Sequence, residues 1–247
     1  MSTTTLAPQR PAPGRLRLPG QADAPDGPVD LTLMWVMHHG FRRDLAAFGR
    51  AVERTPLEDR RTWELLRRRW DYFASVLHHH HTGEDAGLWP LLLERAAAAG
   101  DAEGRAILEA MAAEHAAIDP LLGECSHGFA RLAGVADGPA REALAAAVAA
   151  ARVHVDRHLA HEERDGMRVL QDHLQPADWE WVGARFFDTA YTTPRLLELV
   201  AWVLHEMPPE GVAALERQER GRALVAVWRL ALRRPFRRRE RAAFRHA

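Results

Sequence analysis

Apolar residues recur three or four positions apart along most of the chain, whereas no segment alternates apolar and polar residues as a strand does. Between Asp30 and about Arg54, for example, Met34, Phe41 and Leu45 fall on one side of a helix. Frequent alanine and leucine strengthen this preference, because both residues favour helix. The pattern predicts an all-α protein.

Glycines and prolines divide the helical pattern into long segments. Gly83, Gly87 and Pro90 are expected to break the second segment and to leave a short helix at 91–99. Pro120 is expected to kink the third segment. The long helices are predicted at about residues 30–54, 57–82, 101–132 and 141–174.

Four long helices with short connections predict an up-and-down four-helix bundle over residues 29–175. Residues 176–232 are predicted to form a C-terminal helical extension of two or three helices, which packs on the bundle or on a protein partner. Residues 1–28 are rich in proline and glycine and are predicted to be a disordered N-terminal arm. Residues 233–247 form an Arg-rich tail, which we expect to be solvated rather than bound to nucleic acid.

Composition limits which partners and which kinds of site the protein can have. The 247 residues carry a formal net charge of −1, which gives no reason to expect a nucleic acid or membrane partner. Cys125 is the only cysteine, so a disulfide framework and a cysteine-rich metal site are excluded. The sequence shows neither a signal-peptide pattern nor an apolar run of about 20 residues, and a cytoplasmic protein is expected.

Two of the predicted helices place a histidine and a glutamate on the side that should face the core. In the second helix the apolar stripe leads into His80 and Glu84, and in the fourth it leads into His158 and Glu162. Residues four positions apart lie about 5 to 6 Å from each other on one helix face, so each pair can reach one metal ion. Burying these groups without a partner would be costly, and a metal removes that cost.

The remaining two helices supply complementary histidines, His38 in the first and His115 in the third. Counting residues from the turns places His115 at the level of Glu84 and of His158, as ligands in an antiparallel bundle require. His38 and His80 are less well matched by the same count, by a rise of about 9 Å that the turn would have to absorb in part.

Several neighbours are weaker candidates. His81 points about 100° away from His80 but is within reach of a second metal, and His39 competes with His38. Asp119 is either a ligand or a hydrogen-bond acceptor before Pro120. We expect solvated positions for three further residues, namely His78, His79 and Glu163.

Histidine and carboxylate ligands on facing helices, with two glutamates available to bridge, suit two iron ions, or two manganese ions, better than one structural zinc. Two such metals could bind or activate a small oxidant. The residues therefore indicate a dinuclear metal centre.

The spaced series of these histidines and glutamates resembles the bacterial type of the hemerythrin-like family, also called HHE cation-binding domains. The resemblance covers about residues 30–175, and it extends to the local sequences MHHGFRRDL, HHHHTGEDAGLWP, EHAAID and HLAHEERD. The family implies a non-haem di-iron centre with an oxo or hydroxo bridge. It implies terminal ligands at His38, His80, His115 and His158 and bridging ligands at Glu84 and Glu162.

The sequence departs from the oxygen-carrying hemerythrins in two places. Those proteins have a second histidine four residues after the one in the third helix, where this chain has Asp119. Their last motif is His-x-x-x-x-Asp, whereas this chain has His158-x-x-x-Glu162. The departures favour redox, sensing or peroxide-linked roles over reversible oxygen carriage.

We therefore expect a non-haem di-iron protein that reacts with or senses O2, hydrogen peroxide or NO, as in oxidative stress. Whether it is an enzyme is left open; a peroxide-decomposing or other oxidoreductase activity is the enzymatic form of the hypothesis. One alternative is an iron-handling protein without turnover. A second is a mononuclear bundle of the DinB-like sort, which leaves Glu84 and Glu162 without a role, and a third is a metal-free interaction bundle.

Overall fold

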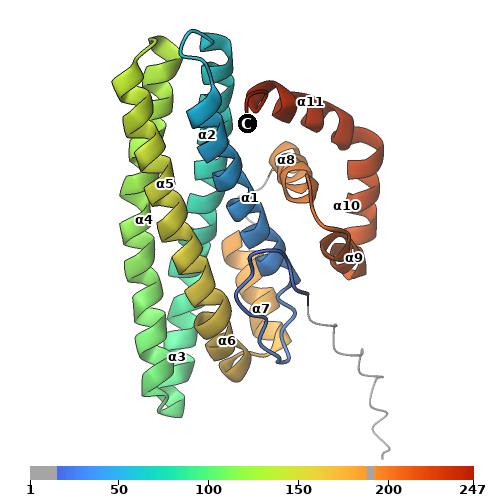
Figure 1. Cartoon of the computed structure of the whole chain (residues 1–247). Helices are drawn as coiled ribbons and strands as arrows, with labels where there is room; N and C mark the ends of the chain where they lie inside the picture. Colours follow the sequence, from blue (N-terminus) through green and yellow to red (C-terminus); the bar gives the residue numbers. More distant parts are fainter. Residues whose placement is uncertain (1–15, 188–191) are drawn as a thin grey trace, which may run out of the picture.

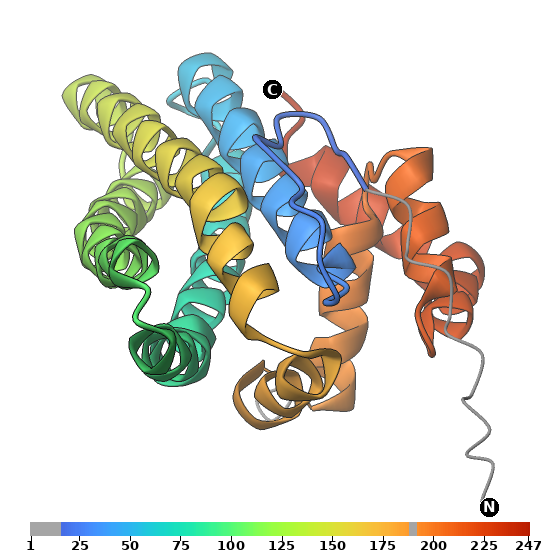
Figure 2. The ribbon, with the colours of Figure 1, turned by 90° about the horizontal axis from the view of Figure 1, so that it is seen from below.

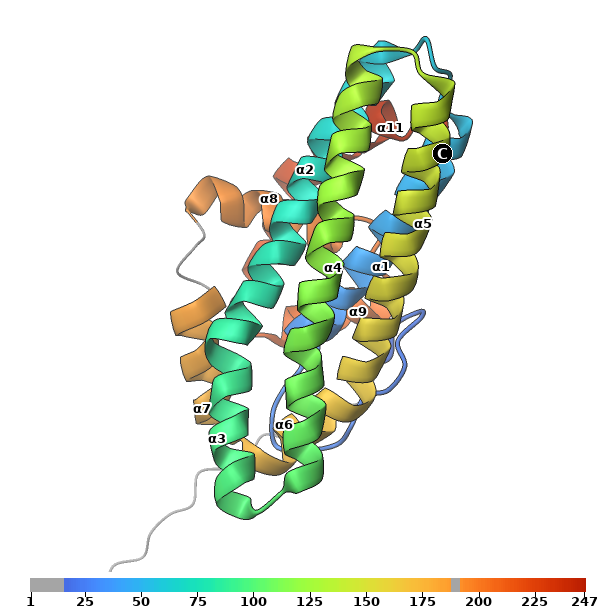
Figure 3. The same ribbon diagram turned by 90° about the vertical axis from the view of Figure 1, so that its left-hand side faces the viewer.

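The computed structural model describes residues 16–187 and 192–247, and within these ranges every regular element is a helix (Figure 1). Four antiparallel rods form the predicted bundle, in which α1 packs on α5, α5 on α4 and α4 on α2 (Figure 3). The all-α bundle is therefore confirmed. The rods are α1 (Thr32–Arg54); α2 (Arg60–Gly83) with η1 (Glu84–Leu88) and α3 (Trp89–Ala99); α4 (Ala102–Gly134); and α5 (Gly138–His161) with η2 (Glu162–Gly166) and α6 (Met167–His173).

Aspartate side chains fix where three of these helices begin. Asp59, Asp101 and Asp137 each precede a helix and accept a hydrogen bond from a backbone N–H in its first turn, at 3.1, 2.8 and 2.9 Å. Such caps satisfy donors that have no partner within the helix. At the other end of α3, Gly100 has φ +74°, which favours glycine, and the chain turns there into α4.

The second rod is not broken where the sequence analysis predicted a break. From Glu84 to Leu88 the backbone widens into a π-helical turn, and Pro90, which has no N–H to donate, lies directly after this turn at the start of α3. Residues 162–166 form the same kind of turn in the fourth rod. Pro120 lies inside α4, which is helical without interruption from Ala102 to Gly134. Four long rods therefore stand side by side.

The segment before α1 differs from the predicted arm. The arm was expected over residues 1–28, of which 1–15 lie outside the described residues. From residue 16 onward the chain packs on the protein, and Leu16, Leu18 and Val29 are buried. The backbone N–H of Val29 donates to the side-chain oxygen of Gln171 in α6, whose amide donates back to the Val29 carbonyl, both at 2.9 Å. These contacts attach the segment to the fourth rod.

The C-terminal extension lies against one side of the bundle, beside α1 and α2 (Figure 2). The Arg-rich tail predicted at residues 233–247 is instead a helix, α11, which packs on α2 and α8. Within the described ranges no helix combines the length and the apolarity that a membrane span requires. The extension consists of α7 (Pro176–Val182), η3 (Gly183–Phe187), α8 (Thr193–Leu204), α9 (Pro209–Arg217), α10 (Gly221–Val227), η5 (Trp228–Leu232) and α11 (Arg233–Ala243).

A buried ion-pair network joins the extension to the bundle. Arg69 of α2 bonds to Asp44 of α1 and donates from Nε to Oε1 of Glu240 of α11 at 2.8 Å. The indole N–H of Trp202 in α8 donates to the same Asp44 carboxylate at 2.7 Å. Burial alone would raise the pKa of Asp44, but Arg69 and Arg43 hold it below its usual value. One arginine thus bonds to two buried carboxylates from different helices, and Arg43 supplies a second positive charge beside Asp44.

Replacing Arg69 with alanine should leave the buried carboxylate of Glu240 without its cation and leave buried Asp44 with Arg43 alone. We expect Arg69→Ala to lower the free energy of unfolding by about 3–5 kcal/mol, the usual cost of removing one partner of a buried ion pair. Urea denaturation followed by circular dichroism measures this quantity.

The matched control is Arg68→Ala, the preceding residue of the same helix, whose side chain is 70% exposed and pairs with Glu64. It should change the free energy of unfolding by about 0.5 kcal/mol or less. Equal losses in the two variants would show that the buried network does not hold the extension in place.

Candidate metal centre

Seven side chains that can bind metal meet in the core of the bundle, and all seven are buried. α1 and α4 contribute one histidine each, the end of α2 contributes two, and α5 contributes one. The two glutamates are the first residues of the two π-helical turns. The seven residues are His38, His80, His81, Glu84, His115, His158 and Glu162.

Six of the seven residues form two groups that can each surround one ion. In the first group His38, His80 and Glu162 offer one atom each within 4.8 Å of one another. In the second group His81, His115 and His158 do the same. His81, a weaker candidate from the sequence, stacks on His115 with ring centroids 3.9 Å apart. The level mismatch expected between His38 and His80 is absent, because their ring centroids lie 5.4 Å apart.

The two glutamates connect the groups. Glu84 places Oε1 3.2 Å from Nε2 of His80 and Oε2 3.6 Å from Nε2 of His115. Glu162 places Oε2 3.3 Å from Nε2 of His38 and 3.6 Å from Nε2 of His158. Each carboxylate therefore faces one histidine of each group, which is the placement that bridging between two ions requires.

The π-helical turns position these glutamates. Glu84 follows the 24 residues of α2, and Glu162 follows the 24 residues of α5, so the two turns occupy matching places in their rods. In each turn the N–H five residues later, that of Trp89 or Met167, bonds to the glutamate's carbonyl. Such turns are rare in proteins, and those that occur often lie at functional sites. The sequence did not predict the turn at Glu84, because the glycines nearby indicated a break.

Three carboxylates outside the cluster orient three of the histidines. Nδ1 of His38 pairs with Glu163 at 2.9 Å, Nδ1 of His115 with Asp85 at 2.9 Å, and Nδ1 of His158 with Glu114 at 2.8 Å. In a neutral ring such a carboxylate holds the proton on Nδ1, so Nε2 keeps its lone pair and points it into the cluster. Burial alone would lower the pKa of His38, but Glu162 and Glu163 raise it to about 9, so its Nε2 has to lose a proton before it can bind a cation. Each orienting residue is the sequence neighbour of a cluster residue on another rod.

Glu163 corrects an expectation from the sequence. It was predicted to face solvent, but it is fully buried and accepts hydrogen bonds from both terminal nitrogens of Arg42. It also accepts one from the backbone N–H of Ala22, at 2.7 Å. The only signal in the sequence was its position next to Glu162, which is too common to be specific.

The hydrogen bonding of the cluster is incomplete without a cation. Nε2 of His115 lies 3.1 Å from Nε2 of His158, a contact that takes one proton between two rings whose Nδ1 atoms already face carboxylates. With both rings neutral, the two Nε2 lone pairs would face each other, and a cation would relieve this repulsion. Eight further buried atoms of the cluster have no hydrogen-bond partner among the described residues: Nε2 of His38 and His80, both ring nitrogens of His81, and both carboxylate oxygens of Glu84 and Glu162. Burying so many unpaired groups is costly, and cations would satisfy all of them except the nitrogen of His81 that carries its proton.

The protonation of the cluster reflects its crowding. Burial, together with repulsion from Glu162, raises the pKa of Glu84 well above its usual range. Burial alone would also raise the pKa of Glu162, but His38 and His158 hold it below its usual value. Burial lowers the pKa of His80 and of His81, so both rings are neutral and keep lone pairs. The two carboxylates compete for one negative charge, which is the condition that cations would relieve.

Aromatic rings surround the cluster. The ring of Phe41 lies 5.2 Å from that of His80, and Trp89 lies 6.5 Å from His115. Phe187 of the extension lies 6.3 Å from His80 and packs on Gly83, where an added Cβ would meet its ring at 2.6 Å. The C-terminal extension therefore forms part of the wall of the cluster.

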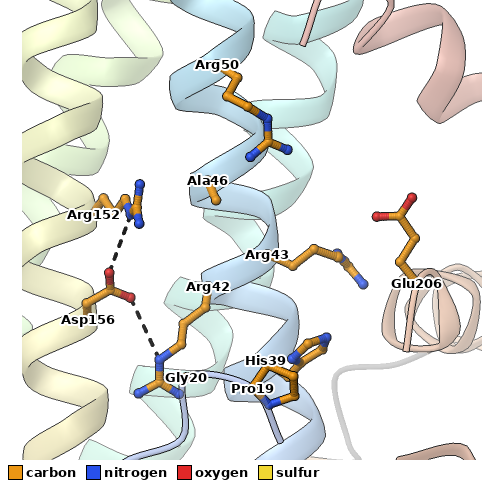
Figure 4. Close-up of a pocket in the computed structure, with 10 residues that line it drawn as sticks. All are labelled: Pro19, Gly20, His39, Arg42, Arg43, Ala46, Arg50, Arg152, Asp156 and Glu206. Atoms are coloured by element: carbon orange, nitrogen blue, oxygen red, sulfur yellow. Dashed lines mark ion pairs between the residues drawn. The ribbon is translucent and has the colours of Figure 1, made fainter. Parts of the chain in front are cut away.

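Two of the weaker candidates lie away from the cluster. His39 lines a surface pocket of about 600 Å³ on α1, together with Arg42 and Glu206 (Figure 4). The side chain of Asp119 is 51% exposed, and its Oδ2 lies 3.9 Å from Nδ1 of His78. The structure thus gives neither residue a place beside the two groups. His79 pairs through Nε2 with the carbonyl oxygen of Phe187 and is not simply solvated.

Comparison with protein families identifies a family that the chain matches. The family model described as "Hemerythrin HHE cation binding domain" matches residues 29–171, which is more than half of the chain. No curated protein and no solved structure matches the chain.

If His81 completes the second group, replacing it should weaken the binding of one ion and spare the other. We expect His81→Ala to reduce tightly held metal from about two ions per chain to about one, because the first group keeps all its side chains. Elemental analysis after equilibration with a chelator measures the remaining metal.

The control is His78→Ala, an exposed histidine of the same run, which should leave metal content unchanged. Unchanged metal content in His81→Ala would remove His81 from the ligand set.

Proposed function

The chain belongs to the hemerythrin HHE cation-binding domain family, and from that premise we propose that its buried cluster holds two iron ions. The proposal rests mainly on the two groups of ligand atoms and on the glutamates that face both. Nitrogen and oxygen ligands in this number suit iron, and manganese is the other metal that they suit.

In this proposal the two ions have unequal surroundings. His38 and His80 would hold one ion, and His81, His115 and His158 would hold the other. Glu84 and Glu162 would bridge them. The first ion would have one histidine fewer, which leaves it better able to accept a ligand from outside the protein.

A pair of redox-active ions supplies a place where a small oxidant binds and exchanges electrons. We therefore propose that the protein reacts with or senses O2, hydrogen peroxide or NO. The protein's own residues would set the conditions: Glu163, Asp85 and Glu114 hold the histidines in one tautomer. Aromatic rings such as Phe41 and Trp89 would exclude larger molecules.

Redox reaction, sensing or peroxide consumption is favoured over reversible oxygen carriage. The position four residues after His115 is Asp119, and its side chain is exposed rather than buried among the ligands. An iron-handling role without turnover is the second candidate. It is favoured by the burial of all seven side chains, because a closed site suits retention of metal. A mononuclear site is disfavoured, since it would use only one of the two groups.

Metal analysis with an optical spectrum of the freshly purified, iron-reconstituted protein tests the metal assignment. We expect about two irons per chain and charge-transfer absorption in the near ultraviolet, as bridged iron pairs with these ligands give. One zinc per chain, or no metal after reconstitution, would contradict the proposal.

Addition of hydrogen peroxide to the loaded protein separates the two roles. Rapid loss of peroxide, monitored with an oxygen electrode and a colorimetric assay, would indicate an oxidoreductase. Slow loss with reversible iron release would indicate iron handling. Glu84→Gln is the matched variant, because it keeps the size of the side chain and removes the charge that a bridge needs; any true activity should fall at least about tenfold in it.

A further inference from the structure

The C-terminal helix α11 has two unlike sides. Phe236 and Ala243 are buried, the ring of Phe244 lies 5.1 Å from that of Phe48, and buried Glu240 bonds to Arg69. This side is the one that holds the helix on the protein. The other side carries the arginine face, which we define as Arg233, Arg234, Arg237, Arg238 and Arg241.

Helical geometry gathers these arginines into one surface. Residues 233, 237 and 241 are four positions apart, as are 234 and 238, so the two rows run side by side along the helix. At a rise of 1.5 Å per residue the rows extend over roughly 12 Å. Four of the five residues are exposed, and Arg237 is partly buried. Leu230, three residues before α11, is 88% exposed.

The arginine face lacks counter-charges. None of its five guanidinium groups forms an ion pair within residues 16–187 and 192–247, whereas Arg239, outside the face, lies 3.8 Å from Glu198. Like charges four positions apart on a helix repel each other and lower its stability. A face that keeps five unpaired charges in register therefore suits a polyanion that would neutralise them.

The positive charge of this C-terminal segment is opposite in sign to the net charge of the rest of the chain. Residues 233–247 contain seven arginines and one glutamate, a formal charge of +6, whereas the whole chain has −1, so the preceding residues carry −7. A polyanion would be repelled by the bundle and attracted to this one helix, which would orient its approach.

We propose that the arginine face of α11 binds the phosphate backbone of duplex nucleic acid without reading its sequence. A duplex carries one negative charge per roughly 1.7 Å of its axis, so a 12 Å row of arginines spans several phosphates. Arginine suits phosphate because its planar guanidinium donates two parallel hydrogen bonds. An anionic membrane is less suited, because a membrane-surface helix turns its apolar side to the lipid and α11 buries that side in the protein.

Fluorescence anisotropy with a labelled duplex of about 20 base pairs and mixed sequence tests the proposal. The wild-type protein should bind with a micromolar Kd at about 50 mM salt, and the logarithm of its affinity should fall with the logarithm of salt concentration with a slope of about −4. Arg234→Glu combined with Arg238→Glu should weaken binding at least about tenfold and reduce that slope by about two.

The matched control is Arg105→Glu combined with Arg152→Glu, which changes the net charge equally at exposed positions on α4 and α5. It should weaken binding less than about threefold, and thermal melting should show both variants to be folded. Equal weakening in the two double variants, or no binding by the wild type, would overturn the proposal. Binding to vesicles containing phosphatidylserine but not to the duplex would also overturn it and would assign the face to a membrane surface.

Discussion

Two carboxylates, Glu84 and Glu162, have to be held side by side in the buried core, and the rest of the bundle is arranged around this requirement. They lie so close that the two cannot both be ionised without repulsion, and neither has a hydrogen-bond partner for its oxygens among the described residues. Both are delivered by the same device, a π-helical turn at the matching place of its rod. The histidines, the carboxylates that orient them and the aromatic rings around them are all arranged about this pair. The centre is therefore a property of four rods held in one register.

The sequence predicted much of this arrangement because helical period is a local property. The stripes of α2 and α5 lead into His80 and His158, and a stripe that faces the core identifies which histidine of a run is buried. The period could not predict contacts that depend on the angle and depth of a neighbouring helix. Glu163 shows this limit: it follows Glu162 by one position, and only its approach to Arg42 and His38 on α1 explains its burial. His81 is a similar case, because its neighbours come from α4 and α5.

The ends of the chain were the least predictable parts, for a related physical reason. Proline and glycine in the first 28 residues and arginine in the last 15 are the compositions of solvated segments. A few apolar residues are enough to attach such a segment when the surface that receives them already exists. Leu18 at one end and Phe236 at the other are buried in this way. The average composition of a segment does not reveal these few apolar residues.

Two glycines of the bundle lie directly under aromatic rings of the C-terminal extension. Gly40, two residues after His38, seats the ring of Trp202, and Gly83, three residues after His80, seats that of Phe187. The family pattern ends at residue 171, so both rings come from outside it. The ligands and part of the wall around them are thus encoded in separate stretches of the gene. Two descendants could keep an identical set of histidines and glutamates, exchange only their C-terminal stretch, and diverge in how readily solvent and electrons reach the centre.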